Sequence, residues 1–68
     1  MSKVVHQDPE ILGGESVFVG TRVPVTILFE HLEGGASIED FLDGFPSVTR
    51  EQVLILLEES KAHALTSA

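Results

Sequence analysis

Residues 37–57 read SIEDFLDGFPSVTREQVLILL, and this stretch decides the fold because it holds two helix-forming segments separated by a turn. In the first segment, apolar residues follow the i, i+3, i+4, i+7 spacing of a helix that buries one face. Pro46 ends the segment, because the residue before a proline is disfavoured in the helical conformation. We therefore predict a helix over residues 38–45 with one apolar face, formed by Ile38, Phe41, Leu42 and Phe45.

The second segment opens with a helix start signal. Thr49-Arg50-Glu51-Gln52 matches the capping box, in which the first and fourth side chains each accept a hydrogen bond from the other residue's backbone N–H. A helix is therefore predicted over about residues 49–64, after the short connection Pro46-Ser47-Val48. A short helix, a tight turn and a longer capped helix make up the helix-turn-helix outline.

A further helix is predicted upstream, over residues 25–33. Gly34-Gly35 ends it, because glycine adopts the left-handed conformation that helix ends often require. Ser37 is placed to cap the next helix, with Asp40 as its capping-box acid. The apolar face of the upstream helix again follows the helical spacing and consists of Val25, Leu28, Phe29 and Leu32.

The region before these helices, about residues 4–24, reads as extended. Two short apolar runs, 17–19 and 22–25, are joined by Gly20-Thr21 and predict a β-hairpin. Pro24 cannot donate a ladder hydrogen bond, so an edge is expected to remain open for another chain. The fold class is therefore mainly α, with a three-helix bundle preceded by a short N-terminal β-hairpin in one domain over residues 1–68.

Composition narrows the function. The 68 residues include 4 Lys and Arg against 11 Asp and Glu, which gives a net charge of −7. This charge argues against a general nucleic-acid binder, because phosphate neutralisation supplies most non-specific affinity. The sequence has no Cys but is 43% hydrophobic, so its small core is expected to be completed by a partner rather than by disulfides.

The last predicted helix carries more apolar side chains than one buried face needs. Leu54 and Ile55 lie outside the face formed by Val53, Leu56 and Leu57. We expect a second molecule to cover them, and a homodimer is the simplest solution. The predicted dimer or partner interface therefore combines the open hairpin edge with this helix and consists of Val17, Val19, Leu54 and Ile55.

Several short motifs follow one another along the chain: Pro9-Glu10-Ile11, Gly13-Gly14, Gly20-Thr21-Arg22-Val23-Pro24-Val25, Gly35-Ala36-Ser37-Ile38-Glu39-Asp40, Phe45-Pro46 and Thr49-Arg50-Glu51-Gln52-Val53. With these motifs in this order, the chain resembles the bacterial and archaeal family called domain of unknown function 433, over roughly residues 5–62. The resemblance implies a homeodomain-like helix-turn-helix domain and an antitoxin-like role, in which the protein neutralises a toxin similar to PIN-type ribonucleases and binds its own operator.

Positive charge common in that family is missing here. Glu15 and Ser16 stand where members tend to have a basic residue and a proline, and Val19 stands where another basic residue is common. These departures weaken the implied DNA role more than the implied toxin role.

Some residues of the turn and the last helix have two interpretations. If that helix enters a major groove, its first turn reads base edges, while Arg22 holds a phosphate. The alternative is that Thr49 and Gln52 only cap the helix, and that Arg50 is solvated or paired with a nearby carboxylate. The candidate DNA-binding residues are Arg22, Ser47, Thr49, Arg50 and Gln52.

The remaining polar residues suggest binding rather than chemistry. Glu39, Asp40 and Asp43 form an acidic cluster, which is either a solvated face or a surface for a basic partner. No catalytic set, metal-ligand spacing or cofactor motif is evident, so we expect no enzyme activity, no metal and no cofactor. No signal-like or membrane-spanning apolar stretch is present, and we expect a cytoplasmic protein.

The leading interpretation is thus a dimeric antitoxin-like helix-turn-helix protein that binds a PIN-like toxin and also operator DNA. Two alternatives stay open. One is a dimeric protein-interaction module without DNA binding, and the other is a transcriptional regulator that needs no toxin.

Overall fold

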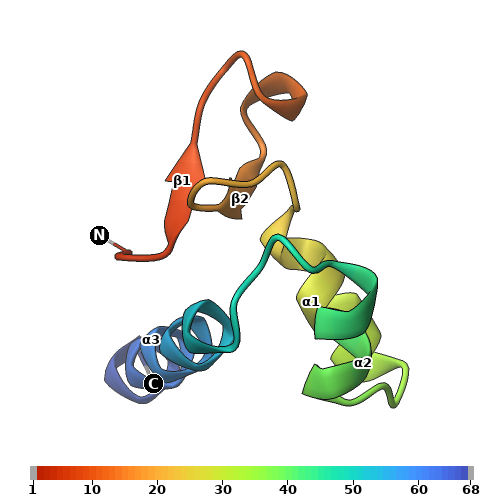
Figure 1. Ribbon diagram of the computed structural model, residues 1–68. Coiled ribbons are helices and arrows are strands. Elements are labelled where there is room, and N and C mark those ends of the chain that lie inside the picture. Colours follow the sequence, from red (N-terminus) through yellow and green to blue (C-terminus); the bar gives the residue numbers. More distant parts are fainter. Residues whose placement is uncertain (1, 68) are drawn as a thin grey trace.

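A computed structural model describes residues 2–67, with side chains to residue 65, and contains three α-helices after an antiparallel two-stranded hairpin. Figure 1 shows the hairpin at one end, α1 and α2 together on one side, and α3 on the other. The predicted fold class is confirmed. The elements in order are β1 (Val5–Gln7), the 3-10 turn η1 (Leu12–Gly14), β2 (Ser16–Phe18), α1 (Val25–Glu33), α2 (Ile38–Gly44) and α3 (Arg50–Ser67).

The hairpin pairs different residues from those the sequence predicted. β1 and β2 pair so that His6 faces Val17 and Val5 faces Phe18. The second predicted strand is reduced to one isolated bridge between Val17 and Pro24. The prediction of a strand there was wrong because Pro24 has no N–H for a ladder and already serves as the N-cap of α1.

The helices follow the predicted bounds closely, because local signals specify them. Ser37 Oγ accepts a hydrogen bond from the Asp40 N–H at 3.1 Å, and an Asp40 carboxylate oxygen accepts one from the Ser37 N–H at 3.2 Å. This confirms the capping box of α2. α1 has the predicted range, α2 ends one residue before the predicted end, and α3 continues beyond Ala64 to Ser67.

One core joins the hairpin to all three helices. Phe18, Leu28, Phe41 and Val53 are fully buried and come from β2, α1, α2 and α3 in turn. The ring centroids of Phe41 and Phe18 lie 6.0 Å apart, which is within the range of favourable aromatic pairs. The position of α3 relative to the hairpin is therefore set by shared burial.

The N-terminal segment is fastened to the middle of α3 by Glu59. Ser2 Oγ donates to Glu59 Oε1 at 2.6 Å, and the Lys3 N–H donates to Glu59 Oε2 at 3.0 Å. Both bonds favour the carboxylate, and the Ser2 hydroxyl is the main reason that the pKa of Glu59 is lowered from its ordinary value. A lowered pKa means that the folded form holds this proton less tightly, so the stabilisation is lost as the pH falls through that lowered value.

Candidate functional site

The polar residues at the start of α3 are bonded to one another. Gln52 Oε1 accepts from the Thr49 N–H at 3.0 Å, and Thr49 Oγ1 accepts from the Gln52 N–H at 3.1 Å. Gln52 Nε2 also donates to the Val19 carbonyl at 2.9 Å. Gln52 thus caps α3 and ties it to the loop after β2, so a bidentate contact to adenine would have to compete with these bonds.

The strength of this tie is testable by replacing Gln52. Gln52→Ala removes the cap acceptor and the Val19 contact, and we expect it to lower the free energy of unfolding by about 1–2 kcal/mol in urea titrations. Gln52→Glu keeps the cap acceptor and loses only the amide donor, so its loss should be smaller. Equal stability of the alanine variant and the unsubstituted protein would contradict the structural role.

Arg50 is also engaged within the chain. Its guanidinium forms an ion pair with the Glu39 carboxylate, which joins the first turn of α3 to the first turn of α2. Both side chains remain more than half exposed, so the pair contributes no more than about 1 kcal/mol to stability. Arg50 therefore follows the alternative interpretation, in which it pairs with a neighbouring carboxylate.

The other two predicted DNA-binding residues meet in one place. Arg22, after β2, and Ser47, in the turn before α3, line an open hollow of about 580 Å³. Within residues 2–65, the Arg22 side chain makes no hydrogen bond and no ion pair. The remaining lining residues are His6, Ile11, Gly20 and Thr21.

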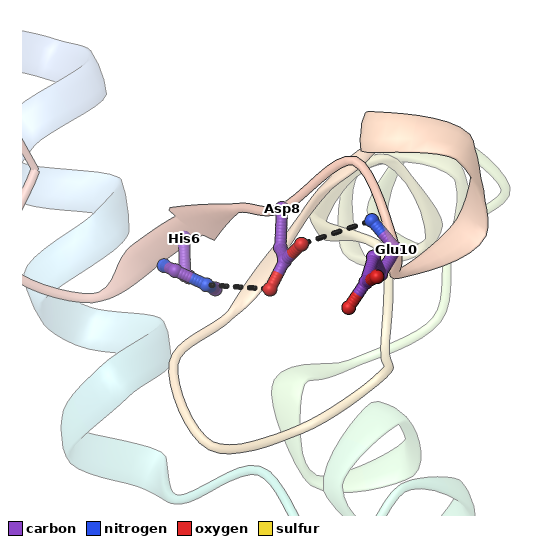
Figure 2. Close-up of polar contacts among 3 residues, drawn as sticks. All are labelled: His6, Asp8 and Glu10. Atoms are coloured by element: carbon purple, nitrogen blue, oxygen red, sulfur yellow. Dashed lines mark hydrogen bonds and ion pairs between the residues drawn. The ribbon is translucent and has the colours of Figure 1, made fainter.

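His6 is the titratable residue among the four lining residues of this hollow that the sequence did not predict. It reaches the hollow because β1 pairs with β2, a contact between segments that no local pattern specifies. Figure 2 shows its ring directed toward Asp8, with Nε2 at 3.9 Å from Asp8 Oδ2. Asp8 Oδ1 accepts in turn from the Glu10 N–H at 2.9 Å (Figure 2). Asp8 thus places a carboxylate next to His6, one of the residues that line the hollow.

The predicted interface residues divide into two groups. Val19 and Leu54 are 45% and 47% exposed, as an interface requires. Val17 is fully buried, so the prediction that it lies at an interface was wrong. β2 has no open edge at Val17, because His6 pairs with it on one side and Pro24 on the other. Ile55 is partly buried against the core, so the chain itself already covers part of its surface.

The acidic cluster lies on α2 and is only partly free. Glu39, Asp40 and Asp43 are all exposed, but Glu39 pairs with Arg50 and Asp40 caps the helix. The Asp43 carboxylate has no bonding partner among the described side chains. The cluster therefore keeps negative charge at the surface while it also stabilises α2 and its contact with α3.

The described residues offer neither a membrane-spanning helix nor a metal site. Across residues 2–67, no helix combines the length and the apolar character needed to cross a bilayer. The same part of the chain contains no group of His, Asp and Glu side chains that could hold a metal ion.

The fold and these surfaces define a small helix-turn-helix domain with an N-terminal hairpin. Comparison with known proteins places it more narrowly, and the chain belongs to the family described as "Protein of unknown function (DUF433)", whose model matches residues 5–58. It is similar to "Uncharacterized protein y4eO" of Sinorhizobium fredii (strain NBRC 101917 / NGR234), with 35% identity over 63 residues. The match covers 93% of this chain but 28% of that relative, so the chain spans less than a third of its length. No solved structure matches the chain.

Proposed function

We propose that this protein is an antitoxin-like, dimeric binding module of the cytoplasm that neutralises a PIN-like ribonuclease. The observation that carries the proposal is the excess of acidic side chains, with a net charge of −7 and the exposed cluster of α2. A ribonuclease groove attracts RNA with positive charge, and exposed carboxylates complement such a groove. The family resemblance supports the same role.

Protein binding is favoured over DNA binding because most polar residues at the start of α3 already bond to other residues of the chain. Gln52 and Thr49 bond to each other, and Arg50 pairs with Glu39. Four cations against eleven carboxylates leave little charge for phosphate neutralisation. Operator binding is the second candidate function. It is supported by Arg22, which lines the same hollow as Ser47 and makes no hydrogen bond or ion pair with its side chain within residues 2–65.

A module that works by binding is also consistent with the length of the relative. The matched region of the Sinorhizobium protein is 28% of its chain, so a similar sequence exists as one part of a longer protein. A domain that functions only by binding can be part of a longer chain, because its binding surface is complete without residues from the other segments.

The proposal is tested by co-expression with the protein encoded by the neighbouring gene, which we expect to be a PIN-like ribonuclease. We expect the two chains to co-purify and the growth arrest caused by the ribonuclease to be relieved. A complex that neither forms nor restores growth would overturn the antitoxin proposal. Salt-dependent retention on the promoter fragment, and not on random DNA of the same length, would support the second candidate.

The role of the acidic cluster is tested by charge reversal on α2. Glu39→Lys combined with Asp43→Lys is expected to weaken ribonuclease binding about 10- to 100-fold, because two attractive contacts become repulsive. Loss of the exposed pair with Arg50 should change the free energy of unfolding by less than about 1 kcal/mol. The measurement is the dissociation constant of the variant for the ribonuclease, together with urea unfolding of the variant and of the unsubstituted protein.

The matched control is Glu10→Lys combined with Glu30→Lys, which changes the net charge equally and leaves α2 intact. Both of these carboxylates are exposed and lie outside α2. Equal weakening by the two double variants would show that only net charge matters. Unchanged binding by the α2 variant would contradict its place in the interface.

A further inference from the structure

The outward face of α3 carries a regular set of side chains. Leu54, Glu58, Lys61 and Leu65 are spaced i, i+4, i+7, i+11, which places them in one line along a helix. We call these four residues the outer stripe. All four are exposed, and Leu54 and Leu65 expose 47% and 72% of their surface. Val53 and Leu56 lie on the opposite side and are buried in the core.

The two charges of the outer stripe have no partner in the part of the chain whose side chains are described. Glu58 and Lys61 make no ion pair and no hydrogen bond with any other described side chain. The C-terminal part of α3 lies beyond the core, since residues 61–65 are all exposed. Both the apolar and the charged members of the stripe are therefore available to another molecule.

The order of the outer stripe is self-complementary. Glu58 lies four positions after Leu54, and Leu65 lies four positions after Lys61, so the spacing is the same at both ends. Along the chain the stripe reads apolar, negative, positive, apolar. If two copies of α3 lie antiparallel about a twofold axis between Glu58 and Lys61, each Glu58 faces a Lys61 and each Leu54 faces a Leu65. A parallel pair would instead place like charges together.

We propose that a second copy of this chain binds the outer stripe through an antiparallel α3–α3 pair. Two ion pairs between Glu58 and Lys61 lie at the centre, and two contacts between Leu54 and Leu65 lie at the ends. A twofold interface requires a surface that complements itself, and the stripe meets this requirement in both charge and apolar character. This inference rests on the homodimer of the proposed function, and it specifies how the two chains of that dimer are arranged.

The test uses charge reversal at each position of the pair. Glu58→Lys or Lys61→Glu alone turns both central pairs into repulsions, and we expect either to raise the dimer dissociation constant at least tenfold in sedimentation equilibrium. A mixture of the two single variants restores both attractions, so it should form heterodimers. The double variant Glu58→Lys with Lys61→Glu should form homodimers as the unsubstituted chain does.

A control variant changes the charge by the same amount elsewhere. Glu10→Lys lies outside α3 and should leave the dimer dissociation constant within about twofold of the unsubstituted value. Circular dichroism of each variant verifies folding, and rescue by mixing is itself evidence that both single variants fold.

The outcomes separate this interface from the rest of the proposed function. A dimer that the single variants leave unchanged overturns the antiparallel α3 pair and keeps the homodimer. A folded chain that is monomeric at about 100 μM overturns the homodimer and this interface together. Ribonuclease binding, measured for both single variants by co-purification, reports on the antitoxin role independently of both results.

Discussion

Replacement of Val17 by lysine is expected to unfold the protein. Val17 is fully buried, and β2 is flanked at this position by His6 and by Pro24. An ammonium group placed there would lose its hydration without gaining a partner, which costs several kcal/mol. A chain of 68 residues has a small total stability, so a cost of this size removes most of the folded population.

Val19→Lys is the matched control, because it introduces the same charge two residues away on a side chain that is 45% exposed. We expect it to change the free energy of unfolding by less than about 0.5 kcal/mol. Far-UV circular dichroism and urea unfolding of the two variants give the comparison. Equal stability of the two would mean that Val17 lies at the surface, as the sequence alone predicted.

The second large effect is expected for Phe41→Ala. Phe41 is fully buried on α2, and its ring lies 6.0 Å from that of Phe18, 5.7 Å from that of His31 and 5.0 Å from that of Phe45. Truncation of a buried phenylalanine to alanine costs about 3–5 kcal/mol, because transfer energy and packing contacts are lost together. We expect no cooperative unfolding transition in urea at 25 °C.

Phe41→Leu tests whether volume or the aromatic ring matters. Leucine fills most of the space and should cost about 1–2 kcal/mol, so this variant should remain folded with a lower urea midpoint. A normal transition for Phe41→Ala would show that the rings of α2 and β2 do not form the core.

These two sites also explain how the candidate surfaces are held. Phe18, the neighbour of Val17, packs in the core that the hairpin shares with the helices, and the ring of Phe41 on α2 lies against the ring of Phe18. The hollow around Arg22 is lined from β1, from the loop after β2 and from the turn before α3. A core variant that frees the hairpin should therefore lose this hollow before any of its lining residues is changed.

Local signals in the sequence predicted the helices. Helical spacing of apolar residues and the two capping boxes act within a few residues, so α1, α2 and α3 follow from the order of side chains alone. The helical spacing also placed Leu54 outside the buried face of α3, and Leu54 is exposed. The spacing of the outer stripe can also be recognised in the sequence. Its exposure follows only from the structure, in which the opposite face of α3 packs into the core.

Local signals of this kind could not predict the contacts between segments that are distant in the chain. Short strands with little alternation carry weak register information, so the sequence favoured pairing of neighbouring runs over pairing of β1 with β2. The tie between Gln52 and Val19 joins residues 33 positions apart, and the bond between Ser2 and Glu59 joins residues 57 apart. Their partners were decided by how the helices pack.

The sequence by itself therefore determined the helices, their caps and the acidic character of the chain. Tertiary structure alone decided that Val17 is internal, that Arg50 pairs with Glu39, and that Arg22 lies beside Ser47 and His6. The physical reason is the range of the interactions. Helix periodicity and capping act along the chain, whereas burial and ion pairing depend on segments that meet only when the core forms.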